Sequence, residues 1–197
     1  METEAERIGY MTESEYLATE EASPVKREFL GGLVYAMAGA SDSHNNIAMN
    51  LYRMLGTQLR GRRCAPFGTD MKLFMRSSGG RKPPHFPYYY YPDAMIACDP
   101  TDNASGIRER PSALFEIISE STRNVDEREK CSMYHLLPSL DAYVRIEQGK
   151  PEVALEHLLP DGWMVERITG LDGVVHLPSL EIELPLAELY ERVDFPS

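Results

Sequence analysis

The sequence predicts an α/β fold in one domain that spans residues 1–197, with a mixed sheet and helices on its faces. Two apolar runs of strand length, residues 91–98 and 113–119, are typical of strands buried on both faces. Between residues 43 and 61, apolar side chains recur at helical spacing. The expected order from there is helix, strand, strand, strand, helix, strand. An apolar strand, a helix and another apolar strand indicate a parallel crossover.

The N-terminal region contains clear start signals. Thr12 and Glu15 form a capping-box pattern, which predicts a short helix ending near Ala18. Residues 26–30 and 33–37 flank Gly31-Gly32, which predicts a β-hairpin with a glycine turn. Either Ser41 or Ser43 is expected to cap the longer helix that follows.

The rest of the chain alternates strands, turns and helices. Residues 77–87 are rich in Gly, Pro and charge and are expected to form a loop. The turn 160–162 predicts a hairpin between the strands 153–158 and 163–168. The remaining expected elements are strands at 70–75, 142–146 and 174–177 and helices at 126–136 and 185–192.

Composition bounds the class of protein. No apolar run approaches 20 residues, so no membrane span is expected, and residues 1–7 lack the apolar segment of a signal peptide. Cys64, Cys98 and Cys131 show no CxxC spacing, which argues against a disulfide framework and a structural zinc site, and favours a cytoplasmic location. The net charge of −11 disfavours a broad basic surface for nucleic acid.

Two carboxylates interrupt the apolar strands. Asp93 follows Pro92 at the start of one strand, and Glu116 lies among apolar neighbours in the next. A buried carboxylate needs a partner or a cation, so a buried salt bridge, an edge strand that exposes Glu116 and a metal site all remain open. Paired carboxylates at neighbouring strand ends suit Mg²⁺, which prefers oxygen ligands.

Together with these carboxylates, several short motifs give the chain a family resemblance. It resembles the Uma2 family, formerly a domain of unknown function, within the PD-(D/E)XK superfamily of restriction-endonuclease-like proteins. The resemblance implies a restriction-endonuclease-like core with an added N-terminal β-hairpin and C-terminal strands. The matching stretches are residues 27–32, Ser43-His44, residues 91–93, residues 111–122 and Asp126 with Lys130 and Tyr134.

The chain departs from the superfamily pattern at Ile118, where a lysine is expected two residues after Glu116. Uma2-like chains resemble members whose lysine has moved to the following helix, and Lys130 is the candidate. Asp126, Lys130 and Tyr134 are four residues apart and share one helical face, so a plain surface pair of Asp126 with Lys130 is the alternative.

Two further residues are candidates for the site. The resemblance implies that Glu28, on the hairpin, joins the acidic cluster as a third metal ligand; the alternative is a solvated hairpin residue. His44 lies at the start of the long helix and could carry a proton there, since its ordinary pKa is near neutrality. The alternative for His44 is a cap or a partner for a carboxylate.

These residues predict a metal-dependent endonuclease that uses Mg²⁺ or Mn²⁺ and acts on nucleic acid, with DNA as the expected substrate. Asp93, Glu116 and Glu28 would hold the metal, and Lys130 and His44 would assist hydrolysis. Two alternatives stay open: a non-catalytic interaction module on the same fold, and a metal-dependent hydrolase of small phosphate esters. A homodimer is expected, because two-fold dimers are the commonest assemblies.

Overall fold

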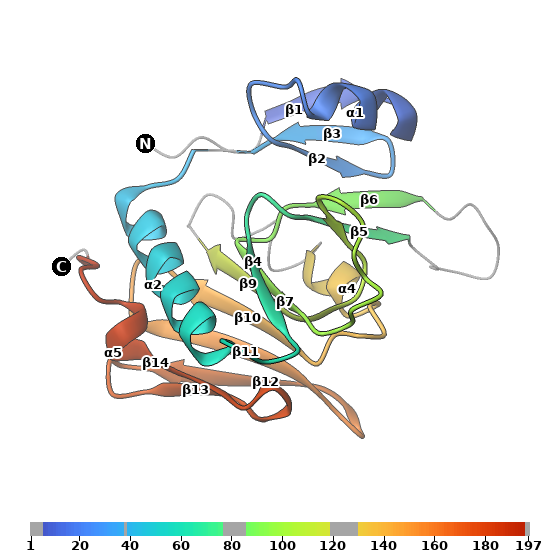
Figure 1. Ribbon diagram of the computed structural model, residues 1–197. Coiled ribbons are helices and arrows are strands. Elements are labelled where there is room, and N and C mark those ends of the chain that lie inside the picture. Colours follow the sequence, from blue (N-terminus) through green and yellow to red (C-terminus); the bar gives the residue numbers. More distant parts are fainter. Residues whose placement is uncertain (1–5, 38, 77–85, 119–129, 196–197) are drawn as a thin grey trace.

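The computed structural model describes residues 6–37, 39–76, 86–118 and 130–195, which form three sheets and a few short helices (Figure 1). The helices are α1 (Glu13–Glu20), α2 (Asp42–Gln58), α4 (Cys131–Tyr134), α5 (Leu186–Leu189) and the 3₁₀ turn η2 (Pro178–Leu180). The strands of the first half are β1 (Glu6–Tyr10), β2 (Arg27–Leu30), β3 (Leu33–Ala36), β4 (Ala65–Gly68), β5 (Lys72–Arg76), β6 (Pro87–Tyr90) and β7 (Ala94–Ala97). The later strands are β8 (Ile107–Arg108), β9 (Pro111–Ile118), β10 (Ala142–Glu147), β11 (Glu152–Leu159), β12 (Gly162–Thr169), β13 (Val174–Leu177) and β14 (Ile182–Pro185).

The N-terminal sheet has the order β1-β3-β2-β6-β5-β8. The predicted hairpin is confirmed as β2–β3, and its turn residues Gly31 and Gly32 have φ values of 60° and 108°, which favour glycine at both positions. The capping box at Thr12 is also confirmed, although α1 continues to Glu20. Strand β1, which pairs with β3, was not predicted.

The second sheet has the order β12-β11-β10-β9-β7-β4 and holds the core. Strands β9 and β10 are parallel, and their neighbours are antiparallel, so the predicted crossover and mixed sheet are confirmed. The hairpin β11–β12 is confirmed as well. Ser41 caps α2, which decides between the two candidate serines.

One expected strand belongs to the other sheet. Residues 70–75 were expected to be the first strand of the core, but β5 pairs with β6 and β8 in the N-terminal sheet. The first core strand is β4, which pairs with β7 at the sheet edge. Its sequence, with Pro66 and Gly68, carries a weak strand signal, and an edge position is where a strand tolerates proline.

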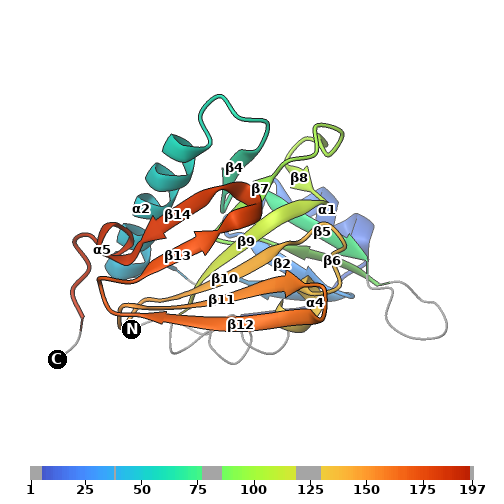
Figure 2. The same cartoon turned by 90° about the horizontal axis from the view of Figure 1, so that it is seen from below.

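Apolar side chains fill both faces of the second sheet. On one face, α2, α5 and the β13–β14 pair cover residues such as Phe115 and Val144, and Figure 2 shows this arrangement from below. On the other face, Leu114 and Tyr143 pack with Tyr134 of α4 and with Leu73 of the N-terminal sheet. The two six-stranded sheets therefore pack through a shared apolar layer, and that layer ends near the strand ends where polar residues gather.

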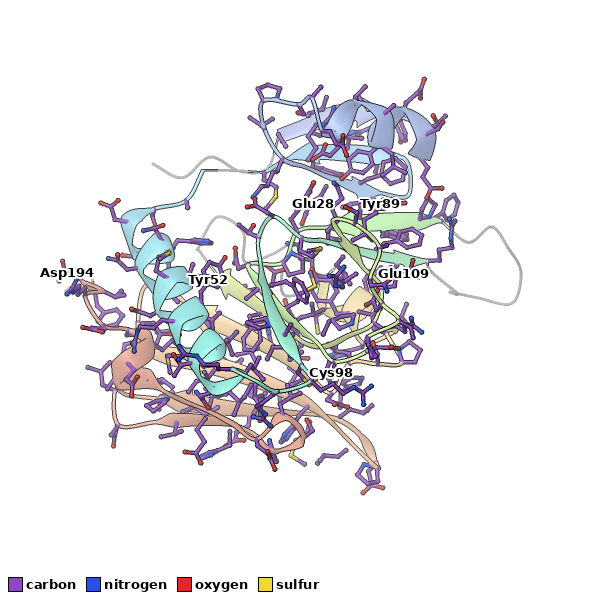
Figure 3. The ribbon with its side chains drawn as sticks, in the orientation of Figure 1. Glu28, Tyr52, Tyr89, Cys98, Glu109 and Asp194 are labelled. Atoms are coloured by element: carbon purple, nitrogen blue, oxygen red, sulfur yellow. A yellow bond between two sulfur atoms is a disulfide. The ribbon has the colours of Figure 1, made fainter. Side chains whose placement is uncertain are left out.

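The cysteines correct one expectation. Cys64 and Cys98 form a disulfide, so the inference from spacing alone was wrong. They lie one step beyond the pair Ala65–Ala97 in the antiparallel register of β4 and β7, and Cys98 is labelled in Figure 3. Sequence spacing missed this pair because its 34-residue separation is closed by strand pairing.

Some expectations lie outside the described residues: most of the loop 77–87, with Arg81 and Lys82, and Asp126 with the first part of the helix 126–136. The C-terminal helix is shorter than expected, since α5 begins after β14 and ends at Leu189, three residues before the expected end. None of the helices in the described ranges combines the length and apolar character that crossing a membrane requires.

Candidate active site

Asp93 and Glu116 lie at neighbouring strand ends. In the antiparallel pair β7–β9, Ala94 is opposite Phe115, and one further step of this register places Asp93 opposite Glu116. The amide of Ile117, the residue after Glu116, donates a hydrogen bond of 2.7 Å to Asp93 Oδ2. The two predicted carboxylates are therefore brought together by strand pairing, although 23 positions separate them in the sequence.

Asp93 is also held by the long helix α2. Ser41 caps this helix by accepting a hydrogen bond from the His44 amide, which puts His44 in the first turn. From there His44 Nε2 lies 3.2 Å from Asp93 Oδ1. Two turns further along α2, the Tyr52 hydroxyl donates to the Asp93 carbonyl at 2.7 Å. The structure thus shows the carboxylate partner that was the alternative for His44, while a role as proton carrier stays a prediction.

Lys130 connects the other two carboxylates. Its Nζ lies 3.2 Å from Glu116 Oε1 and 3.2 Å from Glu28 Oε1. Glu28 Oε1 also accepts a hydrogen bond of 3.1 Å from the amide of Tyr91. Figure 3 labels Glu28 on the side of the N-terminal hairpin that faces the second sheet. The solvated alternatives for Glu28 and Lys130 are thus excluded, since their side chains are 11% and 8% exposed.

Tyr134 completes the surroundings of Glu116. Its hydroxyl donates to Glu116 Oε1 at 2.9 Å from the turn of α4 that follows Lys130. Full burial, reinforced by the charge of Glu116, raises the pKa of Tyr134 well above its usual value, so the hydroxyl stays protonated and remains a donor.

A buried network beneath the hairpin positions Glu28 and was missed by sequence reasoning. The guanidinium of Arg27 pairs with Glu20 at 2.8 Å, and the Tyr91 hydroxyl donates to the same carboxylate at 3.0 Å. The Tyr16 hydroxyl donates to the Arg27 carbonyl at 2.7 Å. Glu20 ends α1 and Arg27 begins β2. Charged residues beside such a turn usually remain solvated, so their positions in the sequence did not indicate a buried pair.

The site concentrates negative charge out of water. Counted over the whole residue rather than the side chain, Glu28, Asp93 and Glu116 are 9%, 8% and 4% exposed, and Lys130 is 6% exposed. With all three carboxylates ionised, a single ammonium group leaves an excess of negative charge in a low-dielectric region, and this is unfavourable unless a cation joins the cluster. Oxygen donors of this kind fit a hard divalent cation. Asp93 and Glu116 are the residues that could hold one, and Glu28 contacts the cluster through Lys130.

Asp70 lies outside this cluster. Its side chain is 92% exposed and pairs with Lys26.

The sequence model of the Uma2 family, described as "Putative restriction endonuclease", matches residues 13–187. Two uncharacterized proteins of Synechocystis sp. are similar over most of their lengths. The first, sll1609, is 30% identical over 178 residues, which is 87% of this chain and 95% of the relative. The second, slr1290, is 27% identical over 187 residues, which is 94% of each chain.

A solved protein from Anabaena variabilis, described as a "putative nuclease belonging to DUF820", shares the fold. The TM-score is 0.68 at 15% identity, and the alignment covers 92% of this chain and 98% of the other. The family description indicates a nuclease of the restriction-endonuclease type, and the neighbour shows the fold. With a match that spans nearly its whole length, the chain belongs to the Uma2 family.

Proposed function

We propose that this protein is an endonuclease that hydrolyses phosphodiester bonds in nucleic acid, with DNA as the expected substrate and Mg²⁺ or Mn²⁺ as cofactor. The observation that carries the proposal is the contact of Lys130 with Glu116, next to Asp93. A lysine beside two carboxylates at strand ends is the arrangement that the family resemblance implies, and here it arises from three separate elements. Restriction-endonuclease-like families generally use divalent metals.

Asp93 and Glu116 would hold the cation, with Glu28 as the third predicted ligand. A bound divalent cation would lower the pKa of a coordinated water and offset charge on the phosphate oxygens. Lys130 donates hydrogen bonds from an ammonium group and, held by Glu116, orients the attacking water. His44, anchored on Asp93 through Nε2 and 23% exposed, would serve as the proton carrier.

The overall charge of −11 is compatible with an anionic substrate only if the site itself attracts it. A divalent cation would reverse the local charge of the acidic cluster, since bound metal ions are often the largest charges in such sites. Binding of substrate and metal should therefore be coupled.

The test is cleavage of supercoiled plasmid and single-stranded DNA with Mg²⁺ or Mn²⁺. Asp93→Asn, Glu116→Gln and Lys130→Met should each lower the rate at least 100-fold, as expected when one electrostatic group of a catalytic site is lost. Glu166→Gln, an exposed carboxylate on β12, is the matched control and should cut at the wild-type rate. Equal cutting by all variants would assign the activity to a contaminant or to another site.

A non-catalytic, dimeric interaction module is the second candidate. It is favoured by the double contact of Lys130, which gives two of the three carboxylates a cationic partner without a metal. Calorimetry with Mn²⁺ separates the two: micromolar binding that is lost in Glu116→Gln supports the nuclease, and absence of binding supports the module. Hydrolysis of a generic phosphodiester without cutting of DNA would support a small-ester hydrolase, and sedimentation measures the proposed homodimer.

A further inference from the structure

A second cluster of ligand-type side chains joins α4 to β11. Cys131 Sγ lies 3.2 Å from Glu156 Oε2 and 3.7 Å from His135 Nε2. His135 Nε2 lies 2.8 Å from the same Glu156 oxygen. Each of the three residues offers one ligand atom, and these three atoms all lie within 4.8 Å of one another.

Two elements bring these residues together. Cys131 and His135 are four residues apart at the start and end of α4, so they share a helical face. Glu156 lies on β11, opposite Tyr143 of β10, and is 2% exposed. Because α4 covers this face of the sheet, the helical pair reaches the strand carboxylate directly.

The three side chains are held in place by their neighbours. The guanidinium of Arg145 pairs with Glu156 Oε1, which directs the other oxygen toward Cys131 and His135. The ring of Trp163 stacks on His135 with centroids 4.0 Å apart and an interplanar angle of 11°. Partners of this kind orient metal ligands and tune their affinity.

We propose that Cys131, His135 and Glu156 form a transition-metal site, with Zn²⁺ as the expected ion. Zinc bond lengths of about 2.0–2.3 Å in tetrahedral geometry place the ligand atoms about 3.3–3.6 Å apart. The observed separations of 2.8, 3.2 and 3.7 Å surround this range. A thiolate and an imidazole select Zn²⁺ over Mg²⁺, whereas the all-carboxylate site suits Mg²⁺.

Binding is a proton exchange. Without metal, the Cys131 thiol donates to Glu156. When Zn²⁺ binds, the thiol releases its proton to solvent and His135 carries its ring hydrogen on Nδ1, which frees Nε2. The thiolate, Nε2 and one oxygen of Glu156 would then be three ligands, with water as the fourth. His135 is 23% exposed, so the site is open to solvent on that side.

The site has a structural consequence for its neighbours. Lys130 directly precedes Cys131, and Tyr134 directly precedes His135, so these two contacts of Glu116 each come from a residue that adjoins a proposed zinc ligand. An ion at this point would fasten α4 to β11 and hold both contacts in place. The inference does not depend on nuclease activity, because metal binding is measured without substrate.

The test is titration of the protein with Co²⁺, a spectroscopic substitute for zinc, in the absence of reductant. Since Cys64 and Cys98 are paired, Cys131 is the free thiol and must be the source of any thiolate-to-cobalt absorption band. The band should saturate at one equivalent of Co²⁺ and be lost on addition of Zn²⁺ but not of Mg²⁺. Cys131→Ser should abolish the band, and His135→Ala should weaken binding at least tenfold.

Two controls keep the result specific. His176→Ala, an exposed histidine paired with Glu183, and Glu116→Gln should both retain the band, which separates this site from the acidic one. Protection of Cys131 from a thiol reagent by Zn²⁺ tests the wild-type protein alone, in case a variant does not fold. Absence of the band, a band that persists in Cys131→Ser, or equal thiol reactivity with and without Zn²⁺ would overturn the proposal and leave a hydrogen-bonded cluster only.

Discussion

Replacing Lys130 with methionine tests how the acidic cluster is held together. Methionine has nearly the same length and volume as lysine, so the substitution removes the charge and leaves the packing largely intact. Glu116 and Glu28 then lose the ammonium group that lies 3.2 Å from an oxygen of each. Both carboxylates remain buried, and Glu116 retains the hydrogen bond from Tyr134.

The expected loss of stability follows from burial. Removing one partner of a buried ion pair costs about 3–5 kcal/mol, because the remaining charge has no compensation. The hydrogen bonds to Glu116 and Glu28 soften this loss, so we expect about 3 kcal/mol. For a chain of this size, 1 kcal/mol lowers Tm by about 2–4 °C, so Lys130→Met should melt about 6–12 °C below the wild type.

The assay is urea unfolding at pH 7 and pH 5, with Lys150→Met as the matched control. Lys150 is 56% exposed and pairs with Glu152 on the surface, so its loss should change stability by less than about 1 kcal/mol. Protonation removes the uncompensated charge, so the deficit of Lys130→Met should shrink as the pH falls. Adding Glu116→Gln should restore part of the stability. A variant as stable as the wild type at pH 7, or a deficit that grows at pH 5, would refute this account of the cluster.

Three further outcomes are expected. Gly68→Ala should reduce DNA cleavage severalfold, because a Cβ at Gly68 would lie 3.2 Å from the Tyr52 side chain that holds Asp93. Gly149→Ala is the control, since a Cβ at Gly149 meets open space. Plasmid cleavage measures both rates, and equal rates would contradict the expectation. Cys64→Ser should lower the free energy of unfolding by about 2–4 kcal/mol, since the disulfide closes a separation of 34 residues; unfolding without reductant checks this, and an unchanged midpoint would be inconsistent with it. Burial, followed by the charge of Glu20, raises the pKa of Tyr16 in the folded state. The contribution of the Tyr16 hydroxyl to stability is therefore complete below the unfolded pKa of about 10 and is lost as the pH rises above that value. A Tyr16→Phe variant should lose less stability between pH 9 and pH 11 than the wild type, and parallel losses in both proteins would argue against this account.

Local signals in the sequence predicted the elements that local physics controls. The capping box at Thr12, the paired glycines of the β2–β3 turn and the apolar face of α2 each act within a few residues, and all three are present in the structure. The parallel crossover between β9 and β10 also followed from the sequence, in which an apolar strand, a helix and another apolar strand come in succession.

The partition of strands between two sheets was not accessible in the same way. Strand β5 was assigned to the core because its own pattern is strand-like, but pairing with β6 and β8 is a long-range choice. Strand β6 was not predicted, although its aromatic residues favour a strand. There Tyr88 and Tyr90 stack at 6.1 Å and Tyr89 packs on Phe74. The disulfide depended on the same long-range pairing.

The position of the lysine shows why a motif can be broken while its geometry persists. Side chains two residues apart on a strand point to the same face, so a lysine at position 118 would have approached Glu116 from within β9. Ile118 occupies that position and is 1% exposed. Lys130 reaches the same carboxylate from the start of α4, at 3.2 Å. Sequence spacing cannot measure this equivalence, because it is set by how α4 packs on the sheet. What the proposed chemistry requires is an ammonium group beside Glu116, and either route supplies it.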